Sequence, residues 1–132
     1  MGADVTVVGL GIDLVEVARV RRMLERRGER ALRRLLTESE LAYVLSRPDP
    51  APHVAARLAA KEAVYKAFQN LPGSAGIGWR DIEVSRDGSG RPAVRFHGRA
   101  ARIFAAVPGL TVQLSLTHSR SAAGAVAILQ AD

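Results

Sequence analysis

The stretch Arg57-Leu-Ala-Ala-Lys-Glu-Ala-Val-Tyr-Lys66, continued to Phe68, has the composition and spacing of a helix. At about 100° per residue its apolar side chains form one broad arc, and two cations, Arg57 and Lys61, fall inside that arc. Burying an unpaired charge is costly, so such cations normally meet an anion. The pattern indicates either an anionic ligand held against this helix or long aliphatic stems that carry the charges to solvent.

Glu62 and Lys66 lie at the edge of the same arc, four residues apart. A surface ion pair worth a few tenths of a kcal/mol explains this spacing without any ligand. The pair therefore carries little information by itself.

The N-terminal region supplies a second carboxylate. Val5 to Leu10 is an apolar run ending in Gly9-Leu-Gly11, which predicts a buried strand followed by a tight turn. Asp13 follows directly, so its carboxylate either projects from the strand edge into a cleft or caps a helix. Magnesium needs only one or two protein carboxylates when phosphates and water complete its octahedron, and Asp13 plus Glu62 would suffice.

The net charge of +6 is concentrated in one segment. Residues 17 to 34 hold eight arginines against Glu25 and Glu29, and the rest of the chain balances. Apolar residues recur there at helical spacing, while Arg19, Arg22 and Arg26 form a stripe on another face. This amphipathic helix is either a solvated basic face or a docking surface for an acidic partner.

A basic nucleic-acid-binding module is the alternative from another functional class. It would leave the cations of the Arg57 helix and the Asp13 carboxylate without a common purpose. Only 5% of the chain is aromatic, which leaves few side chains for base stacking. We therefore expect no nucleic acid as the partner.

Near the C-terminus, Ser115-Leu-Thr-His118 ends a predicted strand. Alternation places Ser115 and Thr117 on one face and His118 at the tip. A lone histidine in a turn is usually a surface residue, but beside hydroxyl groups it can bind phosphate. The phosphate loop and the complete dinucleotide fingerprint are both missing from the sequence.

The remaining pattern predicts one α+β domain over residues 1–132, with a mostly antiparallel sheet packed on helices in the order β-α-α-α-β-β-α-β-β. Thr37 and Glu40 form a capping box, whereas the prolines after Arg47 predict an exposed loop before the Arg57 helix. A hairpin is expected around 82–84 and 93–96, a helix over 98–107, and final strands over 111–116 and 122–129.

Composition excludes several classes of protein. The chain contains no cysteine, which rules out disulfides and thiolate metal sites. It has neither an apolar run long enough to span a bilayer nor an initial signal sequence, so we expect a soluble, cytoplasmic protein that does not associate with membranes.

Taken in order, five segments resemble the signature of holo-acyl-carrier-protein synthases, a type of 4′-phosphopantetheinyl transferase. They span nearly the whole chain: Gly11-Ile-Asp-Leu-Val-Glu-Val-Ala-Arg19, Leu36-Thr-Glu-Ser-Glu-Leu41, Arg57 to Phe68, Asp81-Ile-Glu-Val84 and Ser115-Leu-Thr-His118. Each segment alone is weak evidence for this family, but their order and spacing together are specific to it.

The resemblance implies a magnesium-dependent enzyme that moves 4′-phosphopantetheine from coenzyme A to a serine of an acidic acyl carrier protein. It implies that Asp13 and Glu62 ligate magnesium and that Lys66 joins them in catalysis. Coenzyme A phosphates would be bound by Arg57, Lys61, Lys66, Ser115, Thr117 and His118. The carrier would dock on Arg19, Arg22 and Arg26.

The family is typically a homotrimer with sites between subunits, so His118 is expected from the neighbour of the chain that supplies Asp13 and Glu62. Glu62 could accept the serine proton through a water, although a carboxylate that ligates magnesium is a weak base. The sequence departs from the family pattern at Leu58, where an aromatic residue is common, and in the glycine-rich segment after Phe68.

Overall fold

Helix α4 (Pro50–Ala67) lies directly against strand β1 (Thr6–Glu16), and two glycines of the strand permit this contact. A Cβ atom on Gly9 would lie 1.8 Å from the carbonyl oxygen of Ala67, and one on Gly11 would lie 1.7 Å from that of Ala63. The prediction of a turn at these glycines is wrong. They keep β1 continuous and let the helix backbone approach it.

The computed structural model describes residues 4–132. The other elements are α1 (Val17–Arg27), α2 (Glu29–Leu35), α3 (Glu38–Leu45), the short 3₁₀ helices Ser74–Gly76 and Trp79–Asp81, β2 (Ile82–Arg86), β3 (Pro92–Phe96), α5 (Gly98–Ala106), β4 (Thr111–His118) and β5 (Ala122–Ala131). Strands β1, β5 and β4 form one antiparallel sheet in that order, and β2 pairs with β3 in a hairpin. The predicted α+β class, the hairpin and the final strand pair are confirmed.

Two details of the predicted order are wrong. The basic segment is two helices, because Gly28 has a φ of +62° and ends α1 before α2 begins. Four α-helices therefore precede the hairpin in the described chain instead of three. The predicted proline loop is also shorter, since Pro50 and Pro52 lie in the first turn of α4, where helical amides have no partner within the helix.

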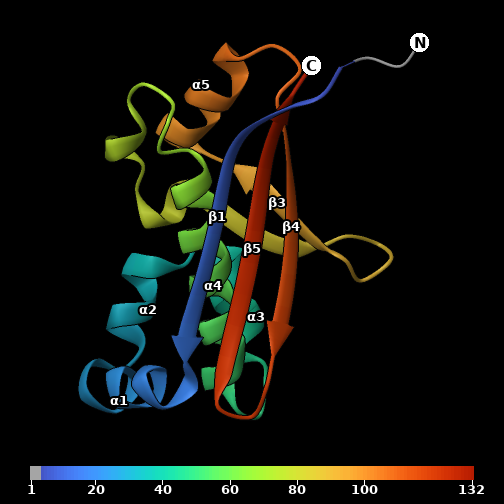
Figure 1. The fold of residues 1–132 in the computed structure, drawn as a ribbon. Coiled ribbons are helices and arrows are strands. Elements are labelled where there is room, and N and C mark those ends of the chain that lie inside the picture. Colours follow the sequence, from blue (N-terminus) through green and yellow to red (C-terminus); the bar gives the residue numbers. More distant parts are fainter. Residues whose placement is uncertain (1–3) are drawn as a thin grey trace.

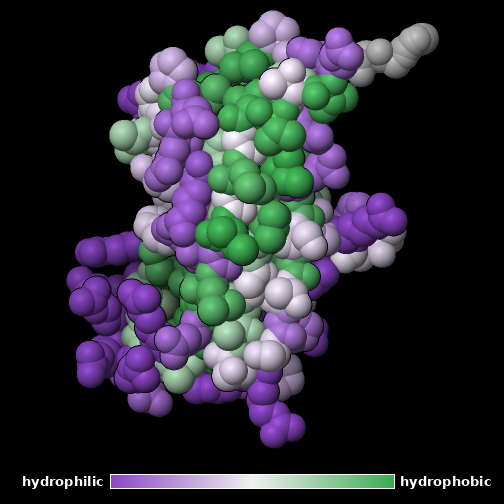
Figure 2. All heavy atoms as spheres, viewed as in Figure 1, coloured by the Kyte–Doolittle hydropathy of each residue, from purple (hydrophilic) through white to green (hydrophobic). Residues whose placement is uncertain are grey.

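The three-stranded sheet has one covered face and one open face (Figure 1). Helix α4 covers the first with a core that includes Ala63, Ala127 and Leu129. On the other face of β1, Leu10, Ile12 and Leu14 are 63%, 68% and 70% exposed, so the predicted buried strand is buried on one side only. Figure 2 shows hydrophobic side chains gathered along this open face, while hydrophilic side chains crowd over α1 and α2.

Helices α1 to α3 form a second core against the N-terminal half of α4. Val17 and Val20 of α1 are buried there, which leaves the arginines of that helix facing outward as its amphipathic pattern predicts. Among residues 4–132, no helix combines the length and apolar character needed to cross a membrane.

Candidate active site

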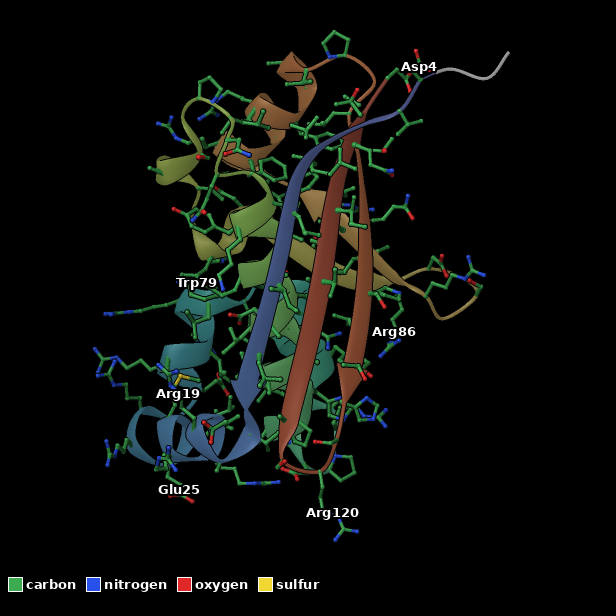
Figure 3. The ribbon with its side chains drawn as sticks, in the orientation of Figure 1. Asp4, Arg19, Glu25, Trp79, Arg86 and Arg120 are labelled. Carbon is green, nitrogen blue, oxygen red and sulfur yellow. The ribbon has the colours of Figure 1, made fainter. Side chains whose placement is uncertain are left out.

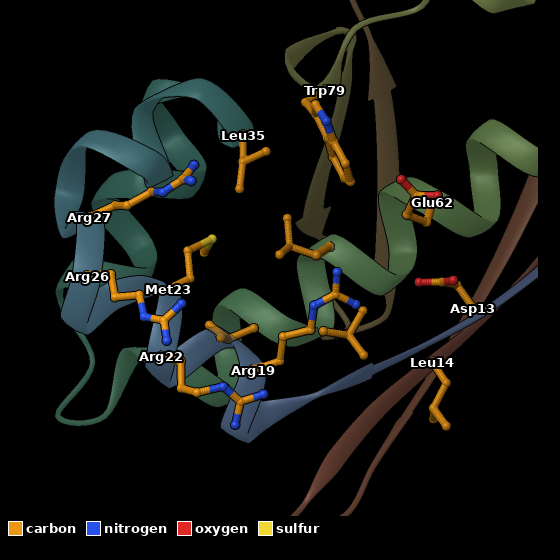
Figure 4. Close-up of a pocket in the computed structure, with 13 residues that line it drawn as sticks. Asp13, Leu14, Arg19, Arg22, Met23, Arg26, Arg27, Leu35, Glu62 and Trp79 are labelled. Atoms are coloured by element: carbon orange, nitrogen blue, oxygen red, sulfur yellow. The ribbon is translucent and has the colours of Figure 1, made fainter.

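A cavity of about 810 Å³ lies between β1, α1, α2, α4 and the 3₁₀ turn at Trp79 (Figure 4). Asp13 on β1 and Glu62 on α4 lie at one end of it. Four arginines of α1 also line it, and Arg19 reaches toward its middle: Arg19, Arg22, Arg26 and Arg27. The two carboxylates and the basic stripe predicted from the sequence therefore share one pocket.

Asp13 reaches the pocket because β1 continues past the glycines. It alternates onto the same face as Gly9 and Gly11, toward α4, and its side chain is only 18% exposed. It lies inside the strand and Glu16 occupies the N-cap position of α1, so the alternative of a capping role for Asp13 is wrong.

The expected ion pair between Glu62 and Lys66 is absent from the described chain. Lys66 Nζ instead lies 3.1 Å from Asp13 Oδ1 and donates to the Ile12 carbonyl oxygen at 3.0 Å. Glu62 is partly buried and has no ion-pair or hydrogen-bond partner among residues 4–132. One carboxylate of the pocket is thus neutralised by Lys66 and the other remains available.

The pocket also has an apolar wall that the sequence did not reveal. Met23, Leu35, Leu58 and Trp79 form it, and the Trp79 side chain is 37% exposed. Trp79 also borders a smaller cavity of about 170 Å³ beside Glu62 and Tyr65. The only available signal was a tryptophan inside a glycine-rich connection, a place where a large apolar side chain has no evident core to fill.

Lys61 meets an anion as predicted, but the anion belongs to the protein. Its Nζ lies 2.7 Å from Glu40 Oε1 and donates to the carbonyl oxygens of Trp79 and Ile82 at 2.8 Å and 2.6 Å. Both side chains of the pair are 1% exposed. Burial lowers the pKa of Lys61, and the Glu40 carboxylate opposes this effect. Because its three donors are occupied, the assignment of Lys61 to ligand binding is wrong.

Glu40 joins three elements around this lysine. The predicted capping box is confirmed, with Glu40 Oε1 accepting from the Thr37 amide at 2.8 Å. Its other oxygen accepts from the Val84 amide at 2.7 Å. The pair therefore fixes α3 and β2 onto α4. Through Lys61 it also holds the backbone carbonyl of Trp79 in place.

Glu83 is anchored next to the same helix cap. It accepts hydrogen bonds from Ser39, from His97 at 2.8 Å and from Thr37 at 2.8 Å. Burial alone would raise the pKa of Glu83, but these hydrogen bonds lower it to about 2. Glu83 is thus a structural carboxylate, ionised at neutral pH.

Arg57 projects from α4 away from the pocket. Its guanidinium lies 4.3 Å from the centroid of the Tyr43 ring and makes a long 3.5 Å contact to the His53 carbonyl oxygen. The Nε atom of Arg57 is buried and has no hydrogen-bond partner among the described residues. Glu62 follows Arg57 by five positions on the helix, which turns the two side chains about 140° apart. A single chain does not bring Arg57 beside the carboxylates.

The hydroxyls of Ser115 and Thr117 face the open side of the sheet. On β5, Gly124 lies between Thr117 of β4 and Leu14 of β1. Both of those side chains lie beside Gly124 on the same face of the sheet, which is the open face. Asp13 faces the opposite side. His118 ends β4 as predicted, is exposed, and is separated from β1 by β5, about 10 Å across the sheet.

The charged side chains also divide between two sides of the molecule. Figure 3 shows Arg19 and Trp79 beyond the β1 edge of the sheet and Arg86 beyond the β4 edge. No three metal-binding side chains gather within residues 4–132 in a way that would hold a metal ion by themselves. Two carboxylates in a roomy pocket still suit a magnesium ion that keeps water and substrate oxygens as its other ligands.

Comparison with known proteins identifies a family that shares this sequence and architecture. The family described as the 4′-phosphopantetheinyl transferase superfamily matches residues 9–121. The holo-[acyl-carrier-protein] synthase of Thermus thermophilus is 51% identical over 126 residues, which are 95% of this chain and 94% of that protein. That of Koribacter versatilis is 40% identical over 125 residues, covering 94% and 98%.

Solved structures agree. The acyl carrier protein synthase of Mycobacterium tuberculosis is 39% identical, with a TM-score of 0.73 and coverage of 96% of this chain and 100% of that one. The Bacillus anthracis holo-(acyl-carrier-protein) synthase in complex with CoA (3′,5′-ADP) is 31% identical, with a TM-score of 0.76 and coverage of 96% and 98%. The chain therefore belongs to the 4′-phosphopantetheinyl transferase superfamily and, within it, to the holo-acyl-carrier-protein synthase enzymes.

Proposed function

We propose that this enzyme transfers 4′-phosphopantetheine from coenzyme A to a serine of an apo-acyl carrier protein, with magnesium held by Asp13 and Glu62. The observation that carries the proposal is the shared pocket. It joins two carboxylates suited to a hard cation with an arginine-lined wall suited to an acidic protein. Relatives in the family are named for this activity, and the Bacillus anthracis relative was solved in complex with CoA (3′,5′-ADP).

The proposed chemistry is a phosphoryl transfer. The oxygen of the carrier serine forms a bond to the β-phosphorus of coenzyme A, and the bond from that phosphorus to the bridging oxygen breaks. Adenosine 3′,5′-bisphosphate leaves, and the serine proton passes to water or to a base. A bound magnesium ion would supply charge neutralisation on the phosphate oxygens.

Basic residues of the chain would hold the substrates in place and neutralise their negative charge. Lys66 is a candidate phosphate ligand because its ammonium lies 3.1 Å from the carboxylate of Asp13, which lines the pocket. Arg19, Arg22 and Arg26, which also line the pocket, are placed to meet an acidic carrier surface. The apolar wall of the pocket would exclude water around the reacting serine.

A complete site would need a second copy of the chain, and we propose a homotrimer. Arg57, Ser115, Thr117 and His118 are the remaining predicted coenzyme A ligands, and none of them lines the pocket of Asp13 and Glu62. The open sheet face, with Leu10, Ile12 and Leu14 exposed, offers apolar surface of the kind that subunit contacts bury. Packing these faces together would bring residues of one subunit against β1, the edge strand that carries Asp13 in its neighbour.

Mass spectrometry of the carrier tests the function. The enzyme is incubated with coenzyme A, magnesium and an apo-acyl carrier protein, and the carrier is then digested to locate the modified residue. The proposal predicts a phosphopantetheine adduct on one serine, lost when magnesium is chelated. Unmodified carriers across fatty-acid and polyketide types, together with steeply salt-dependent binding of random DNA, would favour the nucleic-acid alternative instead.

A further inference from the structure

Only two of the nineteen basic residues in this chain are lysines, and both lie on α4 next to a carboxylate. The Lys61–Glu40 pair is 2.7 Å long with both side chains 1% exposed, so it is a fixed internal contact. The Lys66–Asp13 pair is 3.1 Å long, with side chains 41% and 18% exposed. Unlike the Lys61 pair, the second pair is reached by solvent and is therefore open to exchange.

We propose that Lys66 is an exchangeable counter-ion of Asp13, which holds this carboxylate in place and is displaced when a divalent cation binds. This inference rests on the metal site of the proposed function. The Lys66 ammonium and a metal ion would compete for the Asp13 carboxylate, since Lys66 contacts its Oδ1 and the same group would be a metal ligand. Glu62 has no such competitor among the described residues.

The exchange couples the metal to the second substrate. Displacement from Asp13 frees the ammonium for another anion in the pocket, and coenzyme A brings phosphates there. By linkage, metal binding then favours phosphate binding, and phosphate binding favours the metal to the same extent. A lysine suits this role because its ammonium is a compact, strongly hydrated point charge, whereas an arginine would grip a carboxylate through two parallel hydrogen bonds.

Binding of Mn²⁺ alone, without coenzyme A or carrier, tests the competition directly by electron paramagnetic resonance titration. We expect Lys66→Gln to bind Mn²⁺ about threefold to tenfold more tightly than the wild type, because the metal no longer displaces an ammonium. Lys66→Arg should bind it no more tightly than the wild type. Arg102→Gln removes the same charge from exposed α5 and should change nothing. Unfolding in urea confirms that each variant is folded.

Coenzyme A binding, measured by calorimetry with and without Mg²⁺, tests the coupling. The wild type should bind coenzyme A more tightly with Mg²⁺, and Lys66→Gln should lose part of that gain. Equal Mn²⁺ affinity in the wild type and Lys66→Gln overturns the inference while leaving the metal site intact. Absence of Mn²⁺ binding in every variant, or equal binding in Asp13→Asn, overturns the metal site and the inference with it.

Discussion

Two lysines one turn and a half apart on α4 play different parts, and their contrast divides the helix into a structural side and a functional side. Lys61 is buried, with three protein acceptors that include a carboxylate. Lys66 is partly exposed and contacts Asp13, a residue that lines a large pocket. A buried ammonium whose donors all have protein acceptors contributes to the structure. An exposed ammonium with one carboxylate partner can leave that partner and pair with a ligand.

The largest effect is expected at the carboxylates on the functional side. Asp13→Asn or Glu62→Gln should lower the rate of phosphopantetheine transfer by about a thousandfold, because loss of one group that organises phosphate charge typically costs that much. Rates are measured from adduct formation on the carrier. Thermal unfolding should stay near the wild-type midpoint. A fully active Asp13→Asn would remove the metal assignment.

The next effect is expected on the structural side. Lys61→Met should destabilise the protein by about 3–5 kcal/mol, since it leaves Glu40 as a buried, unpaired carboxylate. Urea unfolding measures the loss. The double variant Lys61→Met/Glu40→Gln should recover part of it by removing the orphaned charge. A single variant as stable as the wild type would show that the pair contributes nothing to the fold.

A smaller effect is expected at the basic wall. Arg19→Glu combined with Arg22→Glu should raise the KM for the carrier by about tenfold or more and leave the KM for coenzyme A unchanged. The matched control is Arg95→Glu with Arg102→Glu, which changes the net charge equally at exposed positions outside the pocket. Equal losses in both double variants would mean that net charge alone, and not this surface, attracts the carrier.

The smallest effect is a pH dependence of stability. The pKa of Glu83 is lowered from 4.5 to about 2, so its stabilising contribution is complete above about pH 4.5 and is lost as the pH falls toward 2. Glu83→Gln should be less stable at pH 7 and should lose less stability between pH 5 and pH 3. Urea unfolding at several pH values checks this. Parallel curves for both proteins would contradict the role of Glu83.

The sequence predicted the elements of this fold better than their contacts. The capping box at Thr37 and the amphipathic pattern of α1 depend on neighbouring residues, so local patterns sufficed. Gly9 and Gly11 were misread as a turn because their reason is the approach of α4, some fifty residues away. The break at Gly28 was overlooked because the helical pattern resumes on the other side of it.

The same holds for the site, where individual residues were predicted better than their contacts. Asp13 and Glu62 were predicted as a pair and do share a pocket. Lys61 was misassigned because the helical wheel showed a buried cation but could not show that Glu40, on another helix, is its partner. Trp79 was missed because a glycine-rich connection gives no periodicity from which to place a side chain.

The most direct test of the contrast on α4 is a comparison of Lys61→Met and Lys66→Gln in which stability and transfer are measured on the same samples. We expect opposite outcomes. Lys61→Met should lose stability in urea and keep most of its transfer rate per folded molecule, whereas Lys66→Gln should keep its stability and lose transfer by about a hundredfold. Parallel losses of stability and transfer in both variants would contradict the division of α4 into a structural and a functional side.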